Sequence, residues 1–500
     1  MCSPADISPV VVLLPAERVT LFDMIYIHWL IFVIYAVVVV LTMITILMDN
    51  RQPAKTMAWI LVLWFIPLLG IILYFFFGQN IRREHIVSKK SLDQLTKRSM
   101  FEFVEQRNLT LPDEHRKLID LFTNQQMALP FKGNTVEIYK DGYEFFPALL
   151  AEIAKARHHI HIDVYIFCDD ALGRLVSDAL IAKAREGVEV RLIYDDVACW
   201  SVKNSFYERM REEGIEVHPF MPVKFPVFTS KANYRNHRKV IVIDGKVGFI
   251  GGMNIALRYV KGYGKGKKHT PWRDTHMKIE GTAVYGLQRA FLIDWYFVDQ
   301  TLITNRKYYP QNIAKDNDCL MQIVSSNPTD SWPTIEQGYV NILLNAKKYV
   351  YIETPYFMPT EPVLFAMRTA ALAGVDVRLM LPLKNDSQLV QWATTSYVME
   401  TVEAGVTVLF YKAGFNHSKV IISDDSLVSC GSLNVDFRSF EHNFECCAFL
   451  YDRDMALRFK EVFAEDEKEC VPIELVKDLS HRSFLIRLWE SLVRLLSPLM

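Results

Sequence analysis

The sequence lacks an excess of charge of either sign: its 500 residues hold 56 Lys and Arg against 57 Asp and Glu, for a formal net charge of −1. Proteins that bind nucleic acid through bulk electrostatics carry a basic surplus, so the composition gives no support for that class of function. The hydrophobic fraction of 51%, with only 21 Gly and 21 Pro, also excludes a disordered or low-complexity chain.

Cysteine occurs at eight positions, but no pair has the C-x-x-C spacing that is typical of zinc and redox sites. So few scattered cysteines in a chain of this length do not indicate a disulfide framework. We therefore expect buried, reduced thiols, which suit a catalytic region in the cytosol.

Apolar residues are concentrated near the N-terminus. Residues 24–48 form a stretch of 25 residues whose polar members are His28, Thr42 and Thr45, and residues 57–77 form 21 residues without a charge. About 20 helical residues cross the hydrocarbon core of a bilayer, so both stretches are long enough. The linker at 49–56 has room only for a hairpin turn. We predict two transmembrane helices, 24–48 and 57–77, followed by a helical linker over 79–130.

Lys and Arg around these two stretches predict their orientation. The N-terminal flank has one, the linker has two, and the flank after the second stretch has six: Arg82, Arg83, Lys89, Lys90, Lys97 and Arg98. The positive-inside rule then places both termini and the catalytic region in the cytoplasm of a multi-pass inner-membrane protein. Residues 1–23 form a separate segment without the basic start of a signal peptide.

The last residues, 480–500, have the pattern of an amphipathic helix. Leu, Phe and Trp recur at spacings of three and four from Phe484 to Leu499, whereas Arg487, Glu490 and Arg494 fall largely on the other face. Such a helix either lies on a membrane surface or docks on the core of its own protein.

Between these segments the chain alternates strand-like and helix-like stretches, and it does so twice. The strand-like segment 160–167 has a counterpart at 349–357, and the Gly-Val-x-Val-Arg-Leu segment at Gly187 recurs at Gly374. Strand–helix alternation predicts sheets covered by helices. We expect an α/β protein with two similar units, 131–310 and 318–470.

The repeat carries one chemical motif. His237, Lys239 and Asp244 are spaced as H-x-K-x-x-x-x-D, and His417, Lys419 and Asp424 repeat this spacing 180 residues later. Each copy is followed, at the same distance, by Gly-x-x-Asn, which ends at Asn254 in the first copy and Asn434 in the second. Two copies in register make chance occurrence implausible.

Residues two apart on a strand project from the same face, so each copy presents an imidazole beside an ammonium. Two such pairs around one point suit a phosphodiester: the lysines hold the anion, one His attacks phosphorus, and the other protonates the leaving oxygen. Asn254 and Asn434 are candidate donors to the phosphate oxygens. Ammonium groups repel a cation, so we expect neither a metal nor another cofactor.

The motif aspartates require a separate explanation. Asp244 is seven residues from His237, which is roughly 23 Å along a strand and an odd number of positions, hence the opposite face. We therefore expect Asp244 and Asp424 to be structural supports. The carboxylates that fix the imidazole tautomers are then predicted to be Asp274 and Glu445, which lie shortly downstream of each Asn.

With these motifs, the chain resembles the phospholipase D superfamily, and within it the bacterial cardiolipin synthases. The resemblance covers nearly the whole chain and includes four further segments: Trp59 to Gly78, Pro271-Trp-Arg-Asp274, Thr354-Pro-Tyr-Phe-Met-Pro359 and Asn434-Val-Asp-Phe-Arg-Ser439. It implies two phospholipase D-like α/β units related by a pseudo-twofold axis after a two-helix transmembrane hairpin. It also places Asp244 and Asp424 in the catalytic motif.

The resemblance further implies a transphosphatidylation. Two phosphatidylglycerol molecules give cardiolipin and glycerol through a covalent phosphatidyl-histidine, without nucleotide or metal. Its partners are then phosphatidylglycerol and anionic membrane lipids, and the basic stretch 258–269 is either a guide for their headgroups or a solvated loop. A hydrolytic phospholipase D, or a transferase with another alcohol acceptor, remains the alternative. The intact motif pair argues against a scaffold, and the neutral charge against a nuclease. The sequence indicates no oligomeric state.

Overall fold

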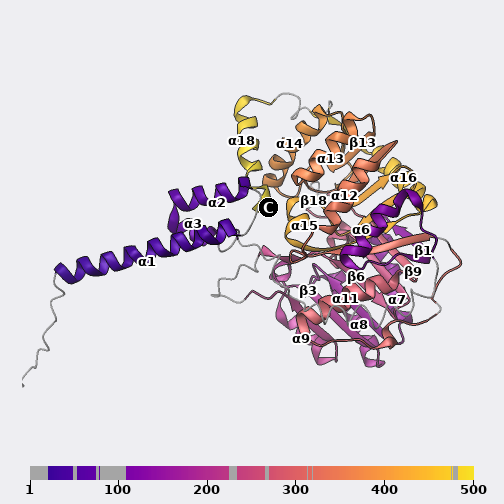
Figure 1. Ribbon diagram of the computed structural model, residues 1–500. Helices are drawn as coiled ribbons and strands as arrows, with labels where there is room; N and C mark the ends of the chain where they lie inside the picture. The colour runs from indigo at the N-terminus through magenta and orange to yellow at the C-terminus, as the bar shows by residue number, and fades with distance from the viewer. Residues whose placement is uncertain are drawn as a thin grey trace, which may run out of the picture. The chain divides into compact units, whose positions relative to one another are not determined.

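The structure is a computed structural model that describes residues 21–48, 53–74, 78, 109–223, 233–264, 270–311, 313–317, 319–473, 476 and 482–499. It divides into two compact units, Met1–Asn80 and Ile81–Met500 (Figure 1). The two predicted α/β repeats therefore belong to one unit.

The described residues of the N-terminal unit form three helices, α1 (Leu21–Met48), α2 (Pro53–Phe65) and α3 (Pro67–Leu73). Within α1, Tyr26–Met48 is long and apolar enough to cross a membrane, as predicted for the first stretch. Helices α2 and α3 pack on α1 through a small cluster formed by Ile46, Leu63 and Tyr74.

The prediction of one continuous helix over 57–77 is wrong for the described residues, because the helix is interrupted at Ile66, between α2 and α3. Pro67 has no N–H and disfavours the helical conformation at Ile66, which adopts φ −138° and ψ 63°. The rings of Trp59 and Tyr74 lie 5.5 Å apart, whereas 15 residues of one helix would separate them by about 22 Å. Neither short helix alone reaches the length of a membrane span, and residues 75–77 lie outside the described ones.

In the described residues, the first repeat has seven strands of the main sheet, two two-residue strands and five α-helices. Its elements are β1 (Phe131–Tyr139), α7 (Gly142–Lys155), β2 (His159–Val164), α8 (Ala171–Arg185), β3 (Glu189–Asp195), α9 (Asn204–Glu212), β4 (Glu216–Phe220), β5 (Arg235–Asn236), β6 (Lys239–Ile243), β7 (Val247–Gly251), α10 (Arg258–Lys261), β8 (Trp272–Arg273), β9 (His276–Gly281) and α11 (Val284–Asp299).

The second repeat follows the same plan. Its elements are β10 (Cys319–Ser326), α12 (Thr334–Asn345), β11 (Tyr349–Glu353), β12 (Phe357–Met358), α13 (Glu361–Leu372), β13 (Asp376–Pro382), α14 (Gln388–Glu403), β14 (Thr407–Tyr411), β15 (Phe415–Asn416), β16 (Val420–Ser423), β17 (Leu427–Gly431), β18 (Val435–Asp436), α15 (Phe437–Glu441), β19 (Asn443–Leu450), α16 (Arg453–Glu467) and β20 (Cys470–Pro472).

The strand order shows how the repeats are related. One sheet runs β20-β14-β13-β11-β16-β17-β19-β10-β1-β9-β7-β6-β2-β3-β4. Apart from β20, equivalent strands of the two repeats occupy the same positions counted from either end of the sheet. The antiparallel pair β1–β10 lies at its centre. In Figure 1 the first repeat, magenta to pink, and the second, orange to yellow, lie side by side, and each contributes its own strands to this sheet. The predicted α/β fold with pseudo-twofold symmetry is confirmed.

Three apolar cores stabilise this unit. One lies beside β2 and β3 of the first repeat, one beside β11 and β13 of the second, and a shared core spans the centre with α11 and α16. Helix α6 (Arg116–Gln126) lies within the predicted linker and precedes the first repeat, yet it packs its buried Leu118, Ile119 and Phe122 into the core of the second. All seven cysteines of the described residues are free thiols, as predicted.

Helix α18 (Phe484–Arg494) docks on α14 through a mixed face, in which the buried side chain of Val493 packs with Ala393. Arg494 forms an ion pair of 2.9 Å with Glu400, Glu490 is buried against Arg482 at 2.6 Å, and the Trp489 ring meets Trp392. The apolar side of the helix is left exposed, at Phe484, Leu485, Leu488, Leu492 and Leu495. The amphipathic pattern is therefore present, and the docked face combines Val493 and Trp489 with Glu490 and Arg494.

The motif aspartates occupy the turns that follow β6 and β16. Asp244, at φ 54°, accepts hydrogen bonds from the backbone N–H groups of three residues, Arg157, His158 and His159, at 2.7 to 3.0 Å. Asp424, at φ 52°, does the same for Lys347, Lys348 and Tyr349 at 2.7 to 2.9 Å. Each carboxylate thus fixes the start of the neighbouring strand, β2 or β11.

We expect Asp244→Ala and Asp424→Ala to lower the free energy of unfolding by about 2–4 kcal/mol, because several charge-assisted hydrogen bonds are lost and Ala fits a positive φ poorly. Activity per folded molecule should stay within about threefold, since neither carboxylate contacts the imidazoles. Thermal unfolding followed beside activity checks this. Loss of turnover with unchanged unfolding would instead place these aspartates in the reaction.

Candidate active site

Two short parallel strand pairs place the motif residues. Strand β5 pairs with β19 so that Asn236 lies opposite Phe444, and the backbone N–H of His237 donates to the Phe444 carbonyl at 2.9 Å. Strand β15 pairs with β8 in the same way, and the N–H of His417 donates to the Arg273 carbonyl at 2.7 Å. The next residue in each register is a carboxylic acid.

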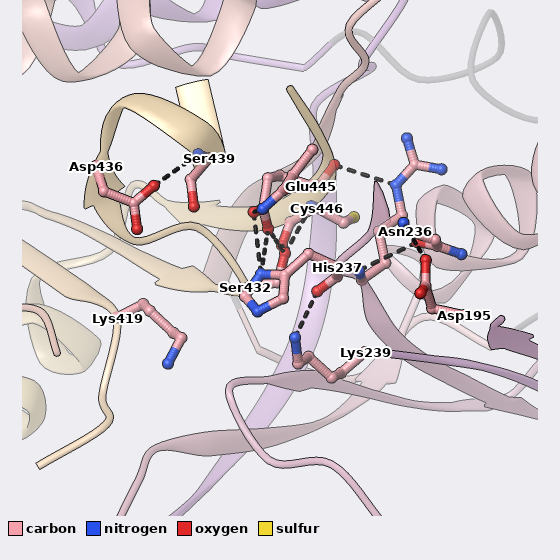
Figure 2. Close-up of polar contacts among 12 residues, drawn as sticks. Asp195, Asn236, His237, Lys239, Lys419, Ser432, Asp436, Ser439, Glu445 and Cys446 are labelled. Atoms are coloured by element: carbon pink, nitrogen blue, oxygen red, sulfur yellow. Dashed lines mark hydrogen bonds and ion pairs between the residues drawn. The ribbon is translucent and has the colours of Figure 1, made fainter. Parts of the chain in front are cut away.

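His237 lies against Glu445. Its Nδ1 is 3.0 Å from Oε1 of this carboxylate and 3.2 Å from Oε2. The Ser432 hydroxyl and the Asn443 amide also donate to Glu445, as Figure 2 illustrates for Ser432. Burial raises the pKa of Glu445, but His237, Lys239 and Ser432 outweigh burial and hold this pKa below its ordinary value. An ionised Glu445 fixes the His237 tautomer that keeps Nε2 unprotonated.

His417 lies against Asp274 in the same manner, with Nδ1 2.6 Å from Oδ2. Asp274 is supported by the backbone N–H of Thr275 at 2.8 Å, and burial raises its pKa against the opposing effect of Lys419. The position equivalent to Ser432 is Gly252, where a Cβ would lie 2.1 Å from Asp274 Oδ1. Any side chain there would displace the carboxylate.

The two carboxylates are exchanged between the repeats. Asp274 belongs to the first repeat and holds the His of the second, whereas Glu445 belongs to the second and holds the His of the first. The prediction that these acids contact the imidazoles thus agrees with the geometry, and their effect on turnover stays a prediction. The exchange could not be predicted from nearness in the sequence, since 208 residues separate His237 from Glu445 and 143 separate His417 from Asp274.

Both motif lysines are buried near the imidazoles. Lys239 Nζ donates to the His237 carbonyl at 2.6 Å, and Lys419 Nζ is 2.8 Å from Nδ1 of His417. Burial lowers the pKa of Lys239 to about 7 and that of Lys419 to about 8, although Glu445 and Asp274 act in the opposite direction. Burial also lowers the pKa of His237 to about 4 and that of His417 well below its ordinary value. An arriving phosphate anion would favour the charged form of the lysines and of one imidazole.

A cavity of about 270 Å³ joins the two motifs. Both His237 and His417 line it, together with Asn254 and Asn434, and its walls include the aromatic side chains of Tyr165, Tyr259, Trp272 and Tyr356. The halves of the molecule therefore bring residues 180 apart in sequence to one cavity, as the repeat predicted. Asn254 is engaged with the Ile166 N–H and the Tyr259 hydroxyl, whereas Oδ1 of Asn434 is buried without a hydrogen-bond partner among the described residues.

Two buried arginines support the motif strands and were not predicted. Arg238, the middle residue of the first motif, forms an ion pair with Asp294 of α11 and donates to the Glu445 carbonyl at 3.1 Å. Its counterpart in the second motif is Ser418, and the guanidinium there comes from Arg273, which pairs with Asp466 of α16 at 2.7 Å and donates to Ser418 at 3.1 Å. The only sequence signal was this Arg–Ser difference at the centre of the motif.

The described residues contain no group of three or more His, Cys, Asp and Glu side chains placed to hold a metal ion. The groups around the cavity are instead two general acid–base pairs and two ammonium groups. Such a set can bind a phosphodiester, attack its phosphorus from one side and protonate an oxygen on the other.

Glu445→Gln and Asp274→Asn should each lower turnover by about 10²–10⁴-fold, because an amide leaves the imidazole in the wrong tautomer. Asp425→Asn, at the β16–β17 turn, is a matched control that should retain turnover within about twofold. Steady-state rates on a phospholipid substrate provide the measurement. Normal turnover in both carboxamide variants would show that the pairs do not orient the imidazoles.

Comparison with known proteins identifies two matching families. The family described as cardiolipin synthase, PLD-like domain, matches residues 149–262 and 339–467, once in each repeat. A second, described as phospholipase D-nuclease N-terminal, matches residues 31–79, which cover most of the N-terminal unit.

Similar sequences extend over the whole molecule. The chain is 38% identical to the major cardiolipin synthase of Bacillus subtilis, with 92% of this chain and 97% of that protein covered. It is 39% identical to a cardiolipin synthase of Listeria monocytogenes, with 91% and 96% covered. Among solved structures, the phosphatidylserine synthase of Haemophilus influenzae shares the fold, with a TM-score of 0.58, 15% identity, and 77% of this chain and 98% of that one covered. The chain therefore belongs to the cardiolipin synthases with phospholipase D-like domains.

Proposed function

We propose that the protein is a phosphatidyltransferase that joins two phosphatidylglycerol molecules into cardiolipin and releases glycerol. The observation that carries this proposal is the single cavity lined by two imidazoles, each with its own buried carboxylate. The family membership supports the phosphatidyl transfer and the lipid substrate.

In the first step, Nε2 of one His attacks the phosphorus of the donor phosphatidylglycerol. A P–N bond forms, the P–O bond to the headgroup glycerol breaks, and the other imidazole, protonated at this stage, gives its proton to the leaving glycerol oxygen. Lys239, Lys419 and the amides of Asn254 and Asn434 are the groups available to bind the phosphate oxygens.

In the second step, the terminal hydroxyl of a second phosphatidylglycerol replaces the departed glycerol. The imidazole that gave up its proton now removes one from this hydroxyl, whose oxygen attacks phosphorus. The P–N bond breaks, cardiolipin is released, and both His side chains regain their starting protonation. Because the proton given in the first step is recovered in the second, no metal ion or nucleotide is needed.

Incubation of the purified protein with phosphatidylglycerol and a chelator should give cardiolipin and glycerol in equal amounts, read by thin-layer chromatography. His237→Asn and His417→Asn should each abolish both products, and mass spectrometry of trapped protein should find a phosphatidyl adduct on one His only. Phosphatidic acid as the main product would instead indicate a hydrolytic phospholipase D.

We further propose that the catalytic unit lies at the cytoplasmic face of the membrane. The flanks before α1 and after α3, up to residue 98, together carry seven Lys and Arg, against two, Arg51 and Lys55, in the linker at 49–56. The predicted multi-pass topology needs a second crossing, and α1 is the only helix of the described residues that is long enough for one. A fluorescent protein fused after Met500 should fluoresce, whereas alkaline phosphatase at the same position should stay inactive.

The exposed apolar side of α18 provides the contact with the lipid surface in this arrangement. Val493 of α18 packs with Met358, which lines the cavity, so the helix lies next to the cavity wall. Leu485→Glu combined with Leu495→Glu should lower turnover on phosphatidylglycerol vesicles about fivefold and leave turnover on detergent micelles unchanged. Leu175→Glu, at an exposed leucine of α8, is the matched control. Equal turnover on vesicles would remove α18 from the membrane contact.

A further inference from the structure

Cardiolipin contains two phosphodiesters, and the two motifs account for only one of them. The phosphorus that is transferred lies between the imidazoles. The acceptor lipid brings a second phosphodiester, which passes through the reaction intact and is separated from the first by one glycerol. An anion so close to the cavity needs a positive group that the transfer step does not use.

Arg258 is such a group. It lines the cavity, and its Cζ lies 5.6 Å from the centre of the Trp272 ring and 5.9 Å from that of Tyr259. The Trp272 ring in turn lies 5.2 Å from the His417 ring. The guanidinium is therefore held on an aromatic wall on the His417 side of the cavity, where stacking orients the plane and leaves its N–H groups available.

No hydrogen bond or ion pair within the described residues uses the Arg258 guanidinium, and its Nε is buried without a partner. A buried N–H group that no protein atom satisfies indicates an unfilled ligand position. The contrast with the second repeat is direct. Arg438 also lines the cavity and follows Asn434 by four residues, as Arg258 follows Asn254, but Arg438 donates to the Asn233 carbonyl at 3.0 Å.

Acidic groups also line the cavity, so its positive charge is localised. Asp386 accepts from the Tyr356 hydroxyl at 2.8 Å, and Asp436 caps α15 through the Ser439 N–H at 2.7 Å. A second phosphate would be repelled from the walls near these carboxylates. The Arg258 guanidinium is the group that can bind this phosphate, because it forms no hydrogen bond or ion pair within the described residues.

We propose that Arg258 binds the intact phosphodiester of the acceptor lipid, and that it thereby selects an anionic phospholipid alcohol over water and neutral alcohols. This inference rests on the proposed function. The planar guanidinium presents two parallel N–H groups to phosphate oxygens, a geometry that lysine does not reproduce. Arg258 is thus a specificity determinant for the second half of the reaction.

The test compares two activities of the full-length protein in phosphatidylglycerol vesicles. Formation of cardiolipin uses an acceptor with a phosphate. Exchange of labelled free glycerol into phosphatidylglycerol uses the same donor and the same imidazoles, but an acceptor without one. Arg258→Gln should lower cardiolipin formation about tenfold or more and leave glycerol exchange within about twofold. Arg258→Lys should fall between Arg258→Gln and wild type, and Arg438→Gln should leave the ratio of the two activities unchanged.

An equal loss of both activities in Arg258→Gln, with an unchanged thermal unfolding midpoint, would overturn the inference by placing Arg258 at the transferred phosphate. Unchanged cardiolipin formation in Arg258→Gln or Arg258→Lys would also overturn it. A wild-type protein that exchanges glycerol but forms no cardiolipin would overturn the proposed function itself, and the role of Arg258 with it. These results differ from one another, so they distinguish a wrong role for Arg258 from a wrong proposed function.

Discussion

The hydrogen bond between each imidazole and a carboxylate of the opposite repeat is the interaction on which the active site depends. It fixes the tautomer of His237 and of His417, and it requires β5 beside β19 and β15 beside β8. Both strand pairs join the two repeats, as does the antiparallel pair β1–β10 at the centre of the sheet. The continuous sheet, the shared central core and the cavity between the motifs are therefore all formed by the packing of the two repeats.

Much of this arrangement could be predicted from the sequence. The spacing of His237 and Lys239, repeated at His417, required a common pocket, and the odd offset of Asp244 excluded it from contact with its own His. The sequence could not show which carboxylate contacts which imidazole, because the two-residue strands that bring them together leave no periodic pattern. The interruption of the second apolar stretch at Pro67 was also missed, since apolar content alone does not reveal where a helix is interrupted.

The duplicated halves are similar in fold and different in detail. Ser432 donates to one catalytic carboxylate while Gly252 leaves room for the other, and the supporting guanidinium comes from Arg238 in one half and Arg273 in the other. Arg438 is tied to Asn233, whereas Arg258 is not tied to any described residue through a hydrogen bond. Such differences allow two nearly symmetric halves to treat a donor and an acceptor lipid differently.

The exchanged carboxylates have a consequence for the nascent protein. When the ribosome has completed the first repeat, His237 already has its lysine but still lacks Glu445, which belongs to one of the last strands to be made. The proposed reaction centre is therefore complete only after nearly the whole chain has been synthesised.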